Sequence, residues 1–163
     1  MPKVAVLTLS DRGAAGERED KSGPEIEKKM QEIEGDVEYY NIIPDDKNKL
    51  RTELIKLSDE LDFDLIFTTG GTGLAPRDIT PDVTKEIIER EVPGIAETMR
   101  WESIKKTPHA MLSRAVVGVR KRSLIINLPG SPKAVRECLD VILPALAHAV
   151  DLVNDNVESC GED

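Results

Sequence analysis

One segment of the chain combines residues that could bind phosphate. Residues 65–73 read Leu-Ile-Phe-Thr-Thr-Gly-Gly-Thr-Gly, so an apolar run ends abruptly in glycines and hydroxyls. Glycines allow a turn that brings backbone N–H groups close to phosphate oxygens, and a helix beginning near Pro81 would add the positive end of its dipole. Thr72, Arg77 and Asp78 supply a hydroxyl, a cation and a carboxylate. The segment predicts a phosphate or nucleotide site, although a plain strand-to-helix turn would also explain the glycines.

Aspartates and a second glycine turn extend this chemistry. Mg²⁺ is typically held by one or two carboxylates plus substrate phosphates, and several aspartates of this chain, Asp45 and Asp78 among them, offer such oxygen ligands. A second turn, Pro129-Gly130-Ser131, precedes a predicted long helix and could present backbone N–H groups to another anion. Together these features predict a substrate with several charges, such as a magnesium nucleotide. The two histidines, one beside a proline and one in a helical stretch, do not suggest a catalytic triad or a zinc site.

These residues lie among predicted strands and helices that alternate along the chain. Apolar runs rich in β-branched residues predict the strands, and apolar residues at helical spacing predict the helices. The alternation predicts an α/β fold, a three-layer, doubly wound, mostly parallel sheet with helices on both faces. Pro144 is expected to kink or divide the last helix. The predicted strands cover residues 4–9, 37–43, 65–69, 115–119 and 124–128, the last two as a hairpin or adjacent pair, and the predicted helices cover residues 23–33, 50–61, 81–91, 95–104 and 132–152.

A polar cluster follows each strand of the predicted parallel sheet. Ser10-Asp11 follows the first, Pro44-Asp45-Asp46 the second, residues 70–78 the third and residues 129–131 the last. In open α/β sheets, ligands bind beyond the carboxyl ends of the strands, so we expect the four clusters to converge on one edge. Each cluster alone could be an ordinary turn or helix cap.

Composition excludes several classes of protein. The 163 residues carry a net charge of −9, which argues against non-specific nucleic-acid binding. No apolar stretch of about 18 residues is present, and Met1-Pro2-Lys3 leads directly into a predicted strand rather than a cleavable signal. We therefore expect a cytoplasmic protein that does not enter a membrane.

The length fits one domain, which we place at residues 1–150. Residues 151–163 form an acidic tail without apolar periodicity, which is typical of disordered segments. Cys138 lies in a helical pattern and Cys160 in this tail, so we do not expect a disulfide or a shared metal site.

Four motifs occur in order along the chain: Ser10-Asp11 with residues 20–24, residues 69–73 with 76–81, residues 111–114, and residues 127–132. Together they resemble a known family, the molybdopterin adenylyltransferases with their molybdopterin-binding fold, from about Val4 to Ala149. The resemblance implies that the terminal phosphate of molybdopterin attacks the α-phosphate of Mg-ATP, giving adenylylated molybdopterin and pyrophosphate.

The resemblance also implies roles for individual residues. Asp45 and Asp78 would serve catalysis, through Mg²⁺ and correct placement of the phosphates. Ser103 could equally be a solvent-facing helix residue, and Ser113 a cap. The residues implied to bind nucleotide or pterin are Ser10, Asp11, Asp20, Gly70, Gly71, Thr72, Gly73, Arg77, Ser103, Ser113, Asn127, Pro129, Gly130 and Ser131.

Two other functions and two partners complete the hypotheses. The chain could be a carrier of the same fold that binds pterin without adenylyl transfer. Against this, an acidic cluster without a metal would not strengthen the binding of a polyanion. It could be a scaffold domain for protein assembly, although we see no linker or second domain. The resemblance further implies a homotrimer and hand-over of the product to a molybdate-insertion protein.

Overall fold

The computed structural model describes residues 1–156 and contains a six-stranded sheet with the strand order β2-β1-β3-β6-β5-β4. The four strands from β2 to β6 are parallel, whereas β5 is antiparallel to β6, and β4 is antiparallel to β5. The alternating elements expected from the sequence are thus confirmed as a mostly parallel α/β sheet. The strands are β1 (Lys3–Leu9), β2 (Asp36–Ile43), β3 (Leu65–Thr69), β4 (Arg90–Glu91), β5 (Val117–Arg120) and β6 (Ser123–Leu128).

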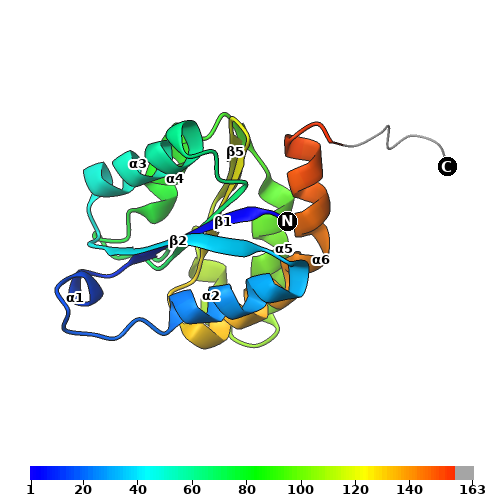
Figure 1. Cartoon of the computed structure of the whole chain (residues 1–163). Coiled ribbons are helices and arrows are strands. Elements are labelled where there is room, and N and C mark those ends of the chain that lie inside the picture. Colours follow the sequence, from blue (N-terminus) through cyan, green and yellow to red (C-terminus); the bar gives the residue numbers. More distant parts are fainter. Residues whose placement is uncertain (157–163) are drawn as a thin grey trace.

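Helices cover both faces of the sheet (Figure 1). One apolar cluster packs α2, α5 and α6 against one face, and a second packs α3 and α4 against the other. Strand β1 serves both clusters, because Val4 and Val6 point to one face and Ala5 and Leu7 to the other. The helices are α1 (Asp11–Ala14), α2 (Ser22–Met30), η1 (Gln31–Ile33), α3 (Lys47–Ile55), η2 (Lys56–Glu60), α4 (Thr80–Ile87), α5 (Pro93–Ile104), η3 (Pro108–Leu112) and α6 (Pro132–Val153).

The central strands are buried on both faces, which explains why their sequences are apolar runs rather than alternating patterns. Every residue of β3 and of β6 is buried, since helices cover both faces of these parallel strands. Edge strand β2 shows alternating burial instead. The parallel strands end at the same level, since Thr69 pairs with Thr8 of β1 on one side and with Leu128 of β6 on the other. The polar residues that follow these strands therefore lie at one edge of the sheet.

The predicted helix over residues 81–91 is too long. Helix α4 ends at Ile87, and Ile88 is already extended. The following backbone pairs with β5, since the Glu89 N–H donates to Val119 O (2.8 Å) and the Val92 N–H to Val117 O (2.8 Å). Pro93 then begins α5 and disfavours helical geometry in the residue before it. This pairing creates β4, a strand that was not predicted from the sequence.

The last helix also differs from its prediction. The prediction that Pro144 divides it is wrong, because α6 is continuous from Pro132 to Val153 with the proline exposed, and the kink at Pro144 stays a prediction. The prediction that a tail typical of disordered segments begins at residue 151 is wrong for its first residues. Residues 151–153 are helical, and Asn154 donates to the Asp64 carboxylate (3.0 Å). Residues 157–163, Cys160 included, lie outside the described residues. Within residues 1–156 no helix is long and apolar enough to cross a membrane.

Candidate functional site

A polar cleft of about 680 Å³ lies beyond the carboxyl ends of the parallel strands. All four polar clusters predicted to converge contribute to it. Among the proposed site residues, those that line the cleft are Ser10, Asp11, Asp20, Asp45, Gly70, Gly71, Arg77, Asp78, Gly130 and Ser131.

The glycine loop is built around two backbone positions that tolerate little else. Gly70 has a φ of 97°, and a Cβ there would lie 2.6 Å from the Leu9 carbonyl oxygen. Gly71 has a φ of 67°, and a Cβ there would lie 2.5 Å from Thr80 Oγ1. Thr80 fixes the loop in turn, because its hydroxyl donates to Gly70 O (3.0 Å) and its N–H to Gly71 O (3.2 Å). The loop therefore passes directly over the end of β1.

Arg114 holds the outer half of this loop, a role that was not predicted from the sequence. Its guanidinium donates to Gly73 O (2.8 Å) and to Asp78 O (2.6 Å), and it forms a salt bridge with Asp82 (3.0 Å). Its own N–H donates to Thr72 O (2.9 Å). The Arg114 interaction lowers the pKa of Asp82. Arg114 thus ties the segment that carries Asp78 to helix α4.

Asp11, Asp45 and Asp78 form an acidic group at one end of the cleft. The Asp45 N–H donates to Asp11 Oδ1 (2.9 Å), and the Ala75 N–H donates to Asp78 Oδ2 (3.0 Å). Burial raises the pKa of Asp45, and the charges of Asp11 and then Asp78 raise it further, although a hydrogen bond from the Asp11 backbone to the Asp45 carboxylate and the charge of Arg77 oppose the rise. A bound cation would relieve this repulsion.

The acidic group fits a magnesium ion that is completed by substrate. In residues 1–156, no three His, Cys, Asp or Glu side chains are arranged to hold a metal by themselves. Mg²⁺ does not need such a cage, since it commonly takes one or two carboxylates and completes its shell with water and phosphate oxygens. The donor set of Asp45 and Asp78 therefore suits a metal that arrives with a polyphosphate.

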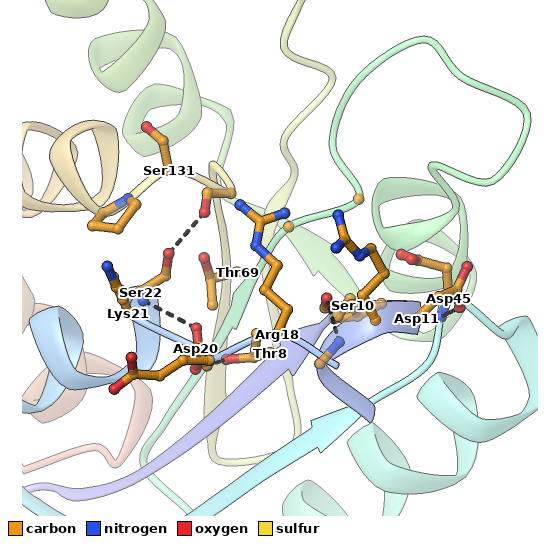
Figure 2. A pocket seen from close by; sticks show the side chains of 18 of the residues that line it. Thr8, Ser10, Asp11, Arg18, Asp20, Lys21, Ser22, Asp45, Thr69 and Ser131 are labelled. Atoms are coloured by element: carbon orange, nitrogen blue, oxygen red, sulfur yellow. Dashed lines mark hydrogen bonds between the residues drawn. The ribbon is translucent and has the colours of Figure 1, made fainter. Parts of the chain in front are cut away.

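Four cations also line the cleft, and only one of them, Arg77, was predicted as a site residue. Within the described chain, none of Arg12, Arg18, Lys21 and Arg77 forms a salt bridge. Figure 2 shows Arg18 between the labelled Asp11 and Asp45 on one side and Lys21 on the other. The signal available in the sequence was the charged run over residues 17–21 between the first strand and the second helix.

Asp20 lines the cleft, but its carboxylate is occupied by the protein. It accepts hydrogen bonds from Ser22 N (3.0 Å), Gly23 N (3.2 Å), Thr8 Oγ1 (2.7 Å) and the Tyr40 hydroxyl. Three of these donors bond Oδ2, and only the Ser22 N–H bonds Oδ1. Asp20 therefore serves mainly to fix the segment before α2.

The second glycine turn is held in place by side chains from β3 and α2. Thr69 Oγ1 donates to Pro129 O (2.7 Å) and Ser22 Oγ donates to Gly130 O (2.7 Å), so both carbonyls are bonded to the protein. Ser131 caps α6 by accepting from Ala134 N (3.2 Å). This arrangement brings the N-terminus of a 22-residue helix to the cleft, where its dipole favours an anion.

Four other proposed site residues lie apart from the main cleft. Ser103, Ser113, Asn127 and Pro129 line a second cavity of about 110 Å³, which is bounded mainly by small and apolar side chains and by Cys138. Burial raises the pKa of the Cys138 thiol. The second cavity adjoins the first, since Pro129 lines one and the next residue lines the other.

Three proposed residues serve mainly the protein itself. Asn127 is fully buried, donates to Thr68 Oγ1 (2.9 Å) and Thr84 Oγ1 (3.0 Å), and accepts from Val116 N (3.1 Å). Thr72 is buried, and neither it nor Gly73 lines either cavity. Their carbonyls instead accept the Arg114 hydrogen bonds.

Comparisons with known proteins agree with this arrangement. The family model described as "Probable molybdopterin binding domain" matches residues 5–148. A molybdopterin adenylyltransferase of Helicobacter pylori (strain J99) is 45% identical over 161 residues, which cover 98% of this chain and 92% of the relative. The corresponding Escherichia coli K12 protein is 38% identical over 91% of this chain and 77% of the relative. The molybdopterin biosynthesis enzyme MoaB from Thermus thermophilus, known from a crystal structure, is 48% identical, with a TM-score of 0.90 over 95% of this chain and 98% of that one.

Proposed function

Because the chain belongs to the molybdopterin-binding domain family that its residues 5–148 match, we propose that it transfers the adenylyl group of ATP to molybdopterin and releases pyrophosphate. Relatives that carry this activity in their names cover almost the whole chain. The observation that carries the proposal is the main cleft, where the acidic group of Asp11, Asp45 and Asp78 meets four cations that form no salt bridge in the described chain. Such a mixture suits two phosphorylated substrates that must be brought together.

In the proposed reaction, an oxygen of the terminal molybdopterin phosphate forms a bond to the α-phosphorus of ATP. The bond from that phosphorus to the bridging oxygen breaks, and pyrophosphate leaves with the electron pair. No protein base is required, because a phosphate monoester is already mostly ionised at pH 7, its second pKa being about 6. The protein's task is to align the two groups and to offset their charge.

The residues of the cleft divide this task. Arg12, Arg18, Lys21 and Arg77 would bind phosphate oxygens, since they have no carboxylate partner in the described chain. The backbone of the glycine loop and the start of α6 would supply N–H donors. The smaller cavity would contribute pterin contacts through Ser103, Ser113 and Pro129, which the family resemblance places among the residues that bind nucleotide or pterin.

Asp45 and Asp78 would hold Mg²⁺ together with the substrate phosphates. The metal would neutralise phosphate charge and withdraw electrons from the α-phosphorus. The two side chains are suited to this role because one approaches from the end of β2 and the other from the loop after β3. Asp11 would support Asp45 through the hydrogen bond to its N–H.

The experiment that tests the proposal follows pyrophosphate release and adenylylated pterin after the protein is mixed with molybdopterin, ATP and Mg²⁺. Asp45→Asn and Asp78→Asn are expected to lower kcat by about 100-fold or more, because losing a metal ligand removes several kcal/mol of transition-state stabilisation. Asp46→Asn is the matched control. It removes the same charge next to Asp45, but Asp46 caps α3 by accepting from Lys49 N (2.9 Å), and asparagine preserves the cap.

The outcomes separate the enzyme from the carrier. Product formed by the wild type and by Asp46→Asn, but not by the folded cleft variants, supports adenylyl transfer. Tight binding of molybdopterin without any ATP-dependent product would contradict it and leave a pterin carrier. Circular dichroism of each variant shows whether loss of activity reflects the site or the fold.

The proposal extends to assembly and to the fate of the product. The family resemblance supports a homotrimer, which sedimentation equilibrium tests directly. It also supports transfer of adenylylated molybdopterin to a protein that inserts molybdate. A monomer at micromolar concentration would contradict the first part, and product that leaves freely and is not taken up by such a protein would contradict the second.

A further inference from the structure

Tyr40 connects the exposed edge of the sheet to the cleft. It lies on the edge strand β2, and its hydroxyl donates to Asp20 Oδ2. The ring crosses the first turn of α2, where a side chain on Gly23 would collide with it and with Asp20 Oδ2 (2.6 Å from the Cβ position). Burial, followed by the neighbouring Asp20 carboxylate, raises the pKa of Tyr40, so its hydroxyl remains a donor at neutral pH.

The Asp20 carboxylate joins three elements of the fold. It takes one hydroxyl donor from β1 through Thr8, one from β2 through Tyr40, and two N–H donors from Ser22 and Gly23 at the start of α2. In this cluster the chain before α2 is held by a single side chain. Thr8, Gly23 and Tyr40 all donate to Oδ2, and Ser22 N–H donates to Oδ1, so the two hydroxyls fix the position of the carboxylate that the two N–H groups bond. Removing the Tyr40 hydroxyl breaks the link to β2 and leaves the carboxylate fixed by β1 alone, so the start of α2 is held less firmly.

The segment fixed in this way carries substrate-facing charge. Arg18 and Lys21 flank Asp20 within three residues, and both line the cleft without a salt bridge in the described chain. Long cationic side chains lose considerable rotamer entropy on binding, so a fixed backbone beneath them strengthens the complex. Figure 2 shows Asp20 next to the backbone from which Lys21 and Ser22 extend.

We propose that Tyr40 is a positioning residue for phosphate binding, which acts through Asp20 to fix the segment that carries Arg18 and Lys21. The inference rests on the proposed function for its consequence, since phosphate binding is what the segment serves. The hydrogen-bond unit itself does not depend on that function. Tyr40 is therefore expected to govern affinity for the phosphorylated substrates, and not the chemical step at the acidic group.

The test compares Tyr40→Phe with Tyr39→Phe. Tyr39 is the adjacent residue of the same strand, and its hydroxyl donates to the Glu53 carboxylate (2.5 Å) away from the cleft. Both variants lose one hydroxyl-to-carboxylate hydrogen bond and keep the ring. Tyr40→Phe is expected to raise KM for ATP about tenfold with kcat within about twofold of the wild type, whereas Tyr39→Phe leaves both unchanged.

A double-mutant cycle identifies the route of the effect. In a background that carries Arg18→Ala and Lys21→Ala, Tyr40→Phe should raise KM by much less than tenfold, because the charges it positions are absent. Equal effects of Tyr40→Phe in both backgrounds would overturn the proposal. A fall in kcat with unchanged KM would also overturn it, since the residue would then act on chemistry.

A measurement without substrate separates this inference from the proposed function. Amide hydrogen exchange by NMR should be faster at Ser22 and Gly23 in Tyr40→Phe than in Tyr39→Phe. Faster exchange in a protein that forms no adenylylated product would contradict the proposed function and support the hydrogen-bond unit. Unchanged exchange at both amides would overturn the inference even in an active enzyme.

Discussion

Replacing Gly70 with alanine isolates the close approach between the glycine loop and β1. Alanine at this position must adopt a φ of 97° and place its Cβ 2.6 Å from the carbonyl oxygen of Leu9. Gly16→Ala is the matched control, because Gly16 has a φ of 74° and nothing within 4 Å of the Cβ position. Both variants lose the freedom of glycine in the unfolded chain, and both force an L-residue to positive φ. Only Gly70→Ala adds a collision.

The collision sets the size of the expected difference in stability between the two variants. The Leu9 oxygen belongs to the backbone of a buried strand, so it cannot turn away as the end of a flexible side chain could. Overpacking of this kind typically costs about 1 to 3 kcal/mol, added to a strain of about 1 to 2 kcal/mol that the two variants share. For a domain of this size each kcal/mol lowers Tm by about 2 to 4 °C. Gly70→Ala should therefore melt roughly 2 to 12 °C below Gly16→Ala.

The assay is urea unfolding and thermal unfolding of both variants at pH 7, followed by circular dichroism. The same samples are assayed for adenylyl transfer, which should fall in Gly70→Ala because the loop must rise from the strand ends. Equal stability of the two variants would refute the reasoning, since the backbone contact would then carry no energy. A loss of stability that is larger in Gly16→Ala would refute it as well.

Three further changes test the charged and buried polar groups. In the folded protein Arg120 lowers the pKa of Asp59 from 3.8 to about 2. The stabilisation of the fold by ionised Asp59 is therefore complete above about pH 4 and is lost as the pH falls towards 2. Asp59→Asn should lower the free energy of unfolding in urea by roughly 1 to 2 kcal/mol at pH 7 and by less at pH 2 to 3. Burial and like charges raise the pKa of Asp45, so its ionised form is unfavourable in the folded state. Asp45→Asn should therefore raise Tm at pH 7 although it lowers turnover, and a lower Tm would contradict this. Asn127→Ala leaves the buried Val116 N–H without its acceptor and should lower the free energy of unfolding by about 2 to 4 kcal/mol, measured by urea unfolding, and a loss below about 1 kcal/mol would show that the network is dispensable.

Much of the architecture could be predicted because it follows from local patterns. Buried parallel strands such as Leu65–Thr69 are continuous apolar runs, and helical spacing distinguishes the segments between them. Beyond these patterns the prediction failed where tertiary pairing decided the outcome. Ile88 and the residues after it have side chains compatible with a helix, but the backbone of β5 offers hydrogen bonds that draw them into the sheet.

The candidate site divides in the same way. Clusters that directly follow a strand, such as Asp45 and Gly70, could be placed because the strand ends fix their position. Arg18 could not, since it lies in a segment without periodicity whose position depends on the Asp20 hydrogen bonds. The interior role of Asn127 could not be predicted either, because its two threonine acceptors are 59 and 43 residues away in the chain.

The charges of the main cleft are divided between separate stretches of chain. Three of the four cations, Arg12, Arg18 and Lys21, lie between β1 and α2 together with Asp11, whereas Asp45 follows β2, and Asp78 follows β3 together with the fourth cation, Arg77. Exchange of a single contiguous stretch could therefore alter the recognition of anionic ligands without moving the two aspartates. In evolutionary terms, selectivity could therefore change separately from turnover as long as Asp11, whose carboxylate accepts from the Asp45 N–H, is kept. A lineage could retune the first by substitutions in one short exposed segment and leave the second intact.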